Sequence, residues 1–241
     1  MFRHKGKTRT LKHNLRIASL LSFVAGIVNI TGFLAVQRLT TNVTGHFAYL
    51  IDEVFRLELE KACIYFLYIF FFFLGSFTSN FLFELISKKF KTTSFTIPVI
   101  IESAILLIMA FTGKILAREN PNLLAFSLLF AMGLQNSLVT TISNSTVRTT
   151  HLTGLFTDLG IELSQLFFYI EQEQRIKLKA SIKLRLSIIS FFFFGGITGG
   201  VFYSHINLYV LIIAGITLLS AFIYDTIKFQ VIILTRKRKS R

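Results

Sequence analysis

The residues of this chain best suited to hold a polar ligand occur in two short phrases, residues 40–51 and 147–160. Each phrase centres on a threonine followed by a glycine, and these pairs are Thr44-Gly45 and Thr153-Gly154. A threonine hydroxyl can accept a hydrogen bond from a free N–H of a first helical turn, and glycine lets another backbone come close. A helix beginning at Thr44 or Thr153 would direct unpaired N–H groups at a ligand. The phrases therefore predict a site for an anion or polar solute, although they could instead serve only tight helix crossing.

The segments around these phrases are apolar enough for a lipid bilayer. Hydrophobic residues make up 53% of the chain, which contains 28 Phe and has a mean hydropathy of +0.63. This exceeds the apolar content of an ordinary soluble domain. The apolar residues form runs of membrane-spanning length rather than amphipathic stripes. We therefore expect one membrane domain over residues 1–241.

Six apolar runs are long enough to cross the bilayer, and each must be helical because an open strand would leave backbone groups unpaired in hydrocarbon. The runs cover about residues 17–37, 62–83, 94–113, 121–142, 185–205 and 207–227. Two further segments, 42–56 and 152–170, hold the Thr-Gly phrases and also carry carboxylates, which are costly inside a bilayer. We expect an all-α integral membrane protein with six transmembrane helices plus two partial or re-entrant helices. Eight full spans are the alternative.

Three short matches in the same order predict an internal two-fold repeat. The matched segments are residues 23–29 with 130–136, the two Thr-Gly pairs, and residues 72–78 with 192–198. The first match shares Phe, Gly and Asn, and the last shares Phe, Gly and Thr. The duplicated units would cover about residues 14–113 and 121–227. Three spans in each unit would invert the second unit in the membrane, whereas four would make the repeat parallel.

The positive charge is placed as in the cytoplasmic loops of a membrane protein. The formal net charge is +14, and the basic clusters flank the apolar runs. This pattern predicts basic cytoplasmic tails at residues 1–16 and 228–241, both termini in the cytoplasm, and membrane lipids as partners. We expect no nucleic-acid partner, because a basic patch without a soluble fold is weak evidence for one. The counts of Lys and Arg do not separate six spans from eight.

Other polar residues lie inside or beside the expected spans. Asn29 and Asn136 match in the repeat and would either line a pathway or only fix helix packing. Glu102 lies within an apolar run, and it and Asp158 are candidates for proton coupling. The predicted substrate-binding residues are Asn29, Thr44, Gly45, His46, Gln135, Asn136, Thr150, Thr153, Gly154 and Asp158.

Signals for enzymatic and metal chemistry are missing from the sequence. Cys63 is the only cysteine, so no intrachain disulfide and no Cys-based metal site can form. Neither His46 nor His151 has a carboxylate or cysteine at metal-ligand spacing. No hydrolase, zinc-protease, phosphate-loop or dinucleotide motif is present. We expect no catalytic residues, no metal and no cofactor, with an intramembrane enzyme as a minor alternative.

Four phrases carry a resemblance to known sequences. They are residues 21–34, 42–46, 131–138 and 147–160, and they are similar to the YoaK-like family of uncharacterised multi-pass bacterial membrane proteins. The similarity covers about residues 14–227. It implies a bacterial inner (plasma) membrane location and supplies no catalytic residues. The family usually has Asp at the position of Asn29.

Together these features predict a small-solute secondary transporter or permease with a polar site at the repeat interface. A small polar or anionic solute would be its substrate, and a homo-oligomer is compatible with the sequence. The alternative is a non-transporting assembly factor, sensor or partner-binding protein. Such a protein would bind its partner through the basic segment 171–185, for which the alternative is a position at the lipid interface.

Overall fold

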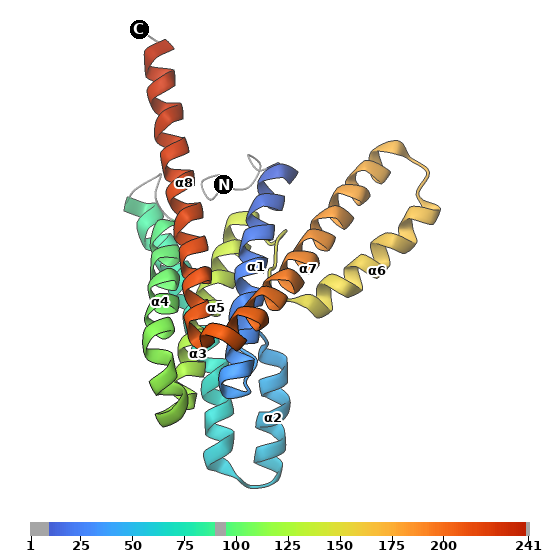
Figure 1. Cartoon of the computed structure of the whole chain (residues 1–241). Coiled ribbons are helices and arrows are strands. Elements are labelled where there is room, and N and C mark those ends of the chain that lie inside the picture. Colours follow the sequence, from blue (N-terminus) through green and yellow to red (C-terminus); the bar gives the residue numbers. More distant parts are fainter. Residues whose placement is uncertain (1–9, 90–94, 240–241) are drawn as a thin grey trace.

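The computed structural model describes residues 10–89 and 95–239, which fold into α-helices joined by short loops (Figure 1). The elements are α1 (Leu11–Val36), α2 (Val43–Phe55), α3 (Leu59–Lys89), α4 (Thr96–Glu119), α5 (Pro121–Ser143), α6 (Leu152–Phe168), α7 (Gln172–Ile206), the short 3-10 helix η2 (Asn207–Tyr209) and α8 (Val210–Lys239). No strand occurs among these residues, as the apolar runs predicted.

Five helical stretches are long and apolar enough to cross a membrane, judged by length and composition. Four of them lie in α1, α3, α4 and α5, and the fifth extends over 57 residues, 172–228, through α7, η2 and most of α8. Neither α2 nor α6 belongs to these stretches. The all-α character and the membrane-type helices predicted from the sequence are therefore confirmed.

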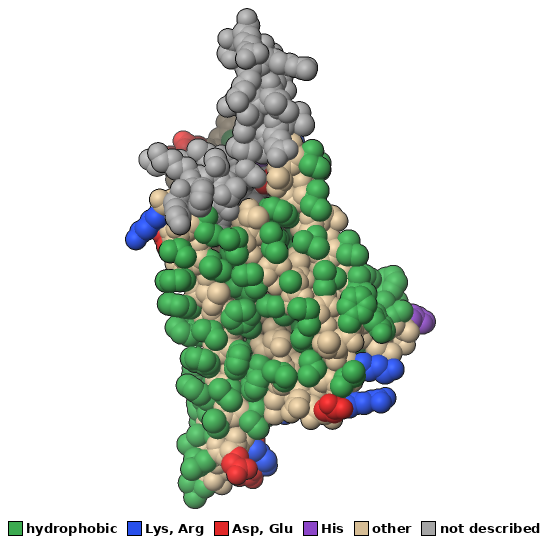
Figure 2. Space-filling view, turned by 90° about the vertical axis from the view of Figure 1, so that its left-hand side faces the viewer, with side chains coloured by type: hydrophobic (Ala, Val, Ile, Leu, Met, Phe, Trp, Pro, Cys, Tyr) green, Lys and Arg blue, Asp and Glu red, His purple; other side chains and the backbone are tan. Residues whose placement is uncertain are grey.

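The outer surface of the bundle is strongly apolar. Figure 2 shows one face on which hydrophobic side chains cover the middle, while charged side chains lie at its lower end, its lower right edge and its upper left edge. Large hydrophobic side chains are exposed on several long helices, for example Phe73 on α3, Phe111 on α4 and Ile216 on α8. A monomeric soluble protein rarely exposes so much contiguous apolar surface, whereas lipid tails can cover it.

Two pairs of long helices cross at glycines. In the first pair, α1 packs along α7. A Cβ added to Gly26 of α1 would lie 2.1 Å from the carbonyl oxygen of Phe192. A Cβ added to Gly195 of α7 would lie 2.1 Å from the carbonyl oxygen of Phe23. The two backbones are thus in direct contact, which requires glycine at both positions.

The second pair, α3 with α5, repeats this arrangement. A Cβ on Gly75 of α3 would lie 2.1 Å from the carbonyl oxygen of Phe130, and a Cβ on Gly133 of α5 would lie 2.1 Å from that of Phe72. The hydroxyl of Ser76 also donates to the carbonyl oxygen of Gly133 at 3.1 Å. These glycines belong to the matched phrases of the sequence, so the matched residues make the same kind of contact.

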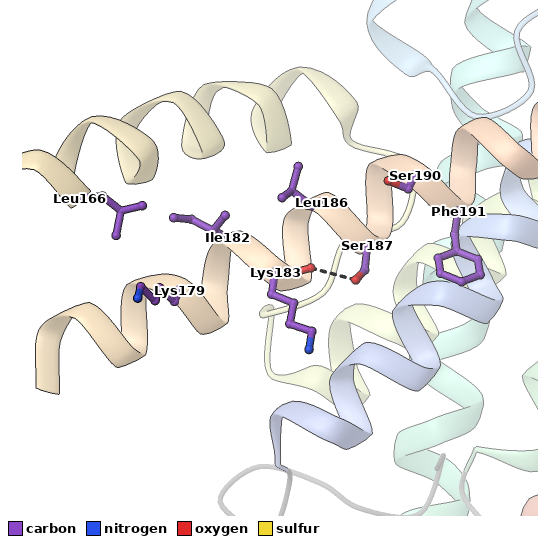
Figure 3. A pocket seen from close by; sticks show the side chains of 8 residues that line it. All are labelled: Leu166, Lys179, Ile182, Lys183, Leu186, Ser187, Ser190 and Phe191. Atoms are coloured by element: carbon purple, nitrogen blue, oxygen red, sulfur yellow. Dashed lines mark hydrogen bonds between the residues drawn. The ribbon is translucent and has the colours of Figure 1, made fainter. Parts of the chain in front are cut away.

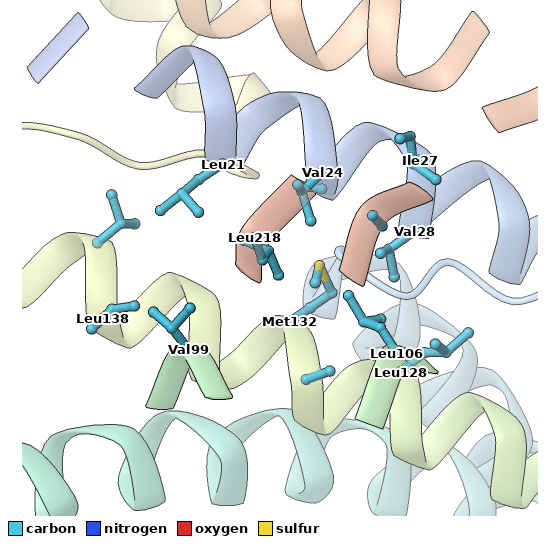
Figure 4. Close-up of a cluster of buried hydrophobic side chains, with 14 of the residues drawn as sticks. Leu21, Val24, Ile27, Val28, Val99, Leu106, Leu128, Met132, Leu138 and Leu218 are labelled. Carbon is cyan, nitrogen blue, oxygen red and sulfur yellow. The ribbon is translucent and has the colours of Figure 1, made fainter. Parts of the chain in front are cut away.

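The main hydrophobic core lies where α1, α4, α5, α7 and α8 come together. Figure 4 shows part of it, with Val24 and Val28 of α1 above Met132 of α5, and with Leu106 and Leu218 reaching in from α4 and α8. All five of these side chains are fully buried. This packing holds α1 and α5 firmly, and the loops that carry the Thr-Gly phrases leave from the ends of these two helices.

The loops before α2 and α6 begin with a chain reversal. Gln37 ends α1 and Asn144 ends α5, both in the left-handed backbone conformation, with φ of 54° and 53°. Each loop then leads into a shorter helix that pairs with the next long one, α2 with α3 and α6 with α7. In Figure 1 the α2–α3 hairpin extends to the lower end of the molecule and the α6–α7 hairpin to the upper right.

Several helices are longer than the expected spans. The most marked case is α7, which begins at Gln172 rather than near residue 185, because its charged first turns are also helical. One stabilising contact there is the Lys177–Glu173 pair at 2.6 Å, with i,i+4 spacing. The expected basic tails are partly helical too, since α1 begins at Leu11 and α8 continues to Lys239. Residues 1–9 and 240–241 of those tails lie outside the described residues.

Candidate functional site

The two Thr-Gly phrases meet at one cavity of ≈ 980 Å³. Its wall is formed by the loops before α2 and α6, the first turns of these helices, and residues of α1, α3, α5 and α7. Eight of the ten predicted substrate-binding residues line it: Asn29, Thr44, Gly45, Asn136, Thr150, Thr153, Gly154 and Asp158. The structure thus brings together residues that are more than 100 positions apart in the chain.

On one side of the cavity, Asn29 joins α1 to the following loop. Its Oδ1 accepts a hydrogen bond from the Thr41 hydroxyl at 2.8 Å. The hydroxyl of the preceding residue, Thr40, donates to the carbonyl oxygen of Val28 at 3.1 Å. Asn29 therefore both holds the loop in place through this hydrogen bond and lines the cavity. The sequence had offered these two roles as alternatives.

The opposite side uses the same residue types. The Asn136 Nδ2 donates to the Thr150 hydroxyl at 2.7 Å, and the Thr149 hydroxyl donates to Asn136 Oδ1 at 3.4 Å. Thr150 was predicted as a site residue, but its counterpart Thr41 was not. Both threonines lie three residues before the threonine of a Thr-Gly pair. Thr41 could therefore have been predicted from Thr150 by applying the predicted repeat to this position.

The start of each short helix differs from the prediction. The expected N-cap residues Thr44 and Thr153 lie inside the first turns, because α2 begins at Val43 and α6 at Leu152. The residue that caps α2 is Asn42, whose Oδ1 accepts from the backbone N–H of Gly45 at 3.3 Å. Asparagine is a stronger N-cap than threonine, and Asn42 comes before the Thr44-Gly45 pair in the chain.

At the start of α6 the capping position is held by His151, whose side chain makes no capping hydrogen bond. A Cβ added to Gly154 would lie 2.6 Å from His151 Nδ1, so the imidazole rests against the first turn in the space that the glycine leaves. The first N–H groups of an α-helix have no partner within the helix. The first turn of α6, from Leu152 to Gly154, therefore brings uncapped N–H groups to the cavity wall.

Arg185 of α7 organises the charges beside the cavity. Its Nη1 lies 2.8 Å from Asp158 Oδ2, and its Nε lies 2.8 Å from Glu162 Oε2. The Ser181 hydroxyl donates to Glu162 Oε1 at 2.6 Å. The Glu162 side chain is only 13% exposed, whereas that of Asp158 is half exposed. Asp158 thus reaches the cavity as one member of an ion-pair cluster, two carboxylates with one arginine, that ties α6 to α7.

Arg148 stands apart from this cluster. It lines the cavity, and within residues 10–89 and 95–239 its guanidinium has neither an ion pair nor a hydrogen bond. A second cavity of ≈ 390 Å³ lies beside α7 and shares Arg148, His151, Gly154 and Asp158 with the larger one. The two spaces therefore adjoin at a wall that contains Asp158 and Arg148, a cation without an ion pair among the described residues.

Two predicted residues lie away from the cavity. His46 is buried, and its Nε2 is 2.8 Å from the Leu39 carbonyl oxygen while its ring lies 4.9 Å from that of Tyr68. Gln135 is fully buried, and its Nε2 donates to the Leu21 carbonyl oxygen at 3.0 Å and to the Thr149 hydroxyl at 3.3 Å. Both side chains hold loops and helices in place rather than facing the cavity.

Glu102 is also separate from the cavity. It lies fully buried in α4, and neither carboxyl oxygen has a hydrogen-bond partner within the described part of the chain. For metal chemistry, the described residues contain no group of three or more His, Cys, Asp or Glu side chains that could hold an ion. The arrangement at the cavity is therefore one of hydroxyls, amides, helix N-termini and arginine, which can bind a polar solute without metal ligands.

Comparison with known proteins gives one match. Residues 17–224 match a family model described as "Protein of unknown function (DUF1275)". Neither a curated protein nor a solved structure matches the chain. The match supports the expectation of an uncharacterised family, while no named homologue tests the YoaK-like resemblance.

Proposed function

The chain belongs to the DUF1275 family of proteins of unknown function, and from this premise we propose that it is a small-solute secondary transporter or permease. The observation that carries the proposal is the cavity of ≈ 980 Å³ where both Thr-Gly phrases converge. Its volume falls within the roughly 300–1,000 Å³ of small-molecule sites. Broken or short helices that meet at such a cavity are the usual binding architecture of secondary transporters.

The proposed membrane arrangement has six crossings, made by α1, α3, α4, α5, α7 and α8. The stretch that holds α7 and α8 supports two crossings rather than one: its 57 residues would be about 85 Å long as one straight helix, far more than the hydrocarbon core of about 30 Å. The short helix η2 divides it. In this arrangement α2 and α6 enter the membrane only partly.

We also propose that the two halves form an inverted repeat. Matched residues make matched contacts: Gly26 and Gly133 each meet a phenylalanine carbonyl oxygen, and Asn29 and Asn136 each hydrogen-bond to a loop threonine. The partners are exchanged, since α1 crosses α7 while α5 crosses α3. A two-fold axis in the membrane plane that relates these pairs passes close to the cavity, as it does in known inverted-repeat transporters.

The proposed location is the bacterial inner (plasma) membrane, with both termini in the cytoplasm. An even number of crossings puts the start of α1 and the end of α8 on one side, and Figure 1 draws both at the same end of the molecule. The charged tip of the α6–α7 hairpin extends toward that end as well. Basic segments of this kind favour the cytoplasmic side.

The proposed substrate is a small polar solute, with anions favoured by Arg148 and the start of α6. Asp158 is paired with Arg185, whereas Arg148 has no ion pair among the described residues and lies beside the uncapped start of α6. Cations and helix N-termini both attract anions. The proposed binding residues are the eight lining residues of the predicted set, and no catalytic residue, metal or cofactor is required.

Asp158 and Glu102 are the proposed proton-coupling groups. Asp158 is half exposed at the cavity wall and shares Arg185 with Glu162, so protonation of Asp158 would loosen the link between α6 and α7. Glu102 is an acid inside an apolar helix, and its carboxyl oxygens have no hydrogen-bond partner among the described residues. Such residues are costly in a membrane and usually mark a proton or ion pathway.

Transport into liposomes tests the proposal. Purified protein should accelerate entry of a small anion, with inorganic phosphate, acetate and a dicarboxylate as the first probes. Asn136→Leu and Thr153→Val should each reduce this flux at least tenfold, because they remove polar groups from the wall. Gly160→Ala is the matched control, since an added Cβ at Gly160 meets no atom within 4 Å. Equal flux in all variants would remove the cavity from the pathway.

A second function, docking of a partner or sensing, is favoured by the tip of the α6–α7 hairpin. Phe167 and Ile170 are 87% and 91% exposed there, between charged residues. Exposed apolar residues of this kind can mark a contact with another protein, including a second copy of the chain. Phe167→Ser with Ile170→Ser should leave solute flux unchanged if transport is the function, whereas a docking protein would lose its partner.

A further inference from the structure

A groove separate from the cavity lies between α6 and α7. It has a volume of ≈ 460 Å³, and Figure 3 shows Leu166 of α6 facing Ile182 and Leu186 of α7 across it. Phe191, further along α7, also belongs to the lining. The groove is open at the protein surface, so a ligand can enter it from the side.

Two lysines complete the lining, Lys179 and Lys183, one turn apart on α7. No carboxylate lines the groove. Within the described residues neither ammonium takes part in an ion pair, whereas neighbouring Lys177 pairs with Glu173 and Arg185 pairs with two carboxylates of α6. Side chains at i and i+4 lie on the same helix face, and lysine stems are flexible enough for two ammonium groups to reach one phosphate.

The groove also lies where α7 changes character. Its residues up to Arg185 include many charged side chains, whereas residues 186–204 contain none. The Ser187 hydroxyl near this boundary is already satisfied, since it donates to the Lys183 carbonyl oxygen at 2.8 Å (Figure 3). Lysines at such a boundary extend toward lipid headgroups while the apolar lining continues into the hydrocarbon.

We propose that this groove binds one anionic phospholipid, with its phosphate at Lys179 and Lys183 and an acyl chain along Leu166, Leu186 and Phe191. The inference rests on the membrane location and not on transport. A free anion would use only the lysines, and a zwitterionic lipid would bring its own cation against them. The combination of two cations without ion pairs among the described residues and apolar side chains on either side of them fits a lipid that carries net negative charge.

Native mass spectrometry of the full chain in detergent tests this inference. Titration with dioleoyl phosphatidylglycerol should give a bound-lipid peak, and dioleoyl phosphatidylcholine should bind at least fivefold more weakly. Lys179→Gln with Lys183→Gln should weaken phosphatidylglycerol binding at least fivefold. Lys177→Gln is the matched control because Lys177 lies on the same helix outside the groove and should leave binding unchanged.

Two further measurements distinguish binding of a whole phospholipid from binding of a free phosphate. Leu186→Asn should also weaken binding of phosphatidylglycerol, while millimolar inorganic phosphate should not displace the lipid. Equal binding of both lipids, full binding by the double lysine variant, or displacement by phosphate would overturn the proposal. All three variants change exposed side chains, and a thermal unfolding curve of each without lipid shows whether it is folded. Because no solute flux is measured, failure here leaves the transport proposal standing, and the reverse also holds.

Discussion

The hairpins α2–α3 and α6–α7 follow equivalent phrases but are held by different chemistry. In α2–α3 the contacts are aromatic: the rings of Tyr49 and Tyr65 stack with centroids 5.2 Å apart, and His46 lies against Tyr68. The Arg38 guanidinium lies 5.5 Å from the Tyr65 ring. In α6–α7 the polar contacts are ionic, from Arg185 to Asp158 and Glu162, beside a small apolar cluster of Leu159, Leu178 and Ile182.

The compared residues occupy matching positions. Tyr49 and Asp158 both come five residues after the threonine of a Thr-Gly pair. Tyr65 and Arg185 both come seven residues before the matched Phe72 and Phe192. One backbone arrangement therefore supports a stacked pair in one half and an ion pair in the other. The difference shows that backbone crossings define the framework, while side chains give each hairpin its own response to salt and charge.

The largest expected effect concerns what the halves share, the glycine crossings. Gly26→Val and Gly133→Val each place a side chain against a backbone carbonyl oxygen of the facing helix. Because backbone atoms cannot move aside as a flexible side chain can, the two helices must move apart to relieve the clash. We expect each to lower stability by about 3 kcal/mol or more and to reduce the yield of folded protein. Thermal unfolding in detergent measures this, with Gly196→Ala as a control whose added Cβ meets no atom within 4 Å. A tolerated valine in one crossing only would show that the halves are not equivalent.

A smaller effect is expected where the halves differ. Arg185→Gln leaves Glu162 without its main partner in a mostly shielded position, and should cost about 2 kcal/mol after allowance for partial exposure. Tyr65→Ala should cost about 1 kcal/mol beyond the lost buried area, through loss of its stacking with Tyr49. Hydrogen exchange of the backbone amides in α6 measures the effect of the Arg185 change, and that in α2 measures the effect of the Tyr65 change. High salt should reduce the effect of the Arg185 change and not that of the Tyr65 change, and equal salt dependence would contradict the assignment.

The smallest effect is expected at the helix starts. Asn42→Ala removes the hydrogen bond to the Gly45 N–H and should destabilise the first turn of α2 by about 1 kcal/mol. His151→Ala should have little capping effect on α6, because His151 makes no such bond. Exchange rates of the amide protons in the two first turns measure the difference. Faster exchange in both helices to the same extent would show that His151 does cap α6.

The long helices could be predicted from sequence because a run of apolar residues of membrane-spanning length has few alternatives in lipid. Their ends could not, since helix formation continues into charged turns such as those before Arg185, which the hydropathy of the sequence does not mark. The N-caps were wrong for a related reason. Asn42 and Thr44 are both good caps, and only the path of the preceding loop selects between them.

The residues of the candidate site that belong to matched phrases of the predicted repeat could be predicted from the sequence. Asn29, Asn136 and the Thr-Gly pairs match between the halves, and all of them line the cavity. Arg185 was missed because its partner Asp158 lies 27 residues away on another helix, so the pair exists only once α6 and α7 are packed together. Gln135 lies beside Asn136 in sequence but points into the core, since successive helix positions face different directions.

By itself the sequence determined that this chain is a bundle of apolar helices, because hydrophobic run length acts locally along the chain, and its paired phrases predicted two matched halves. Only the tertiary structure decided that α1 pairs with α7 and α5 with α3, and hence that two distant phrases share one cavity. The physical reason is that helix pairing depends on how closely two backbones can approach over several turns. No single segment contains that information.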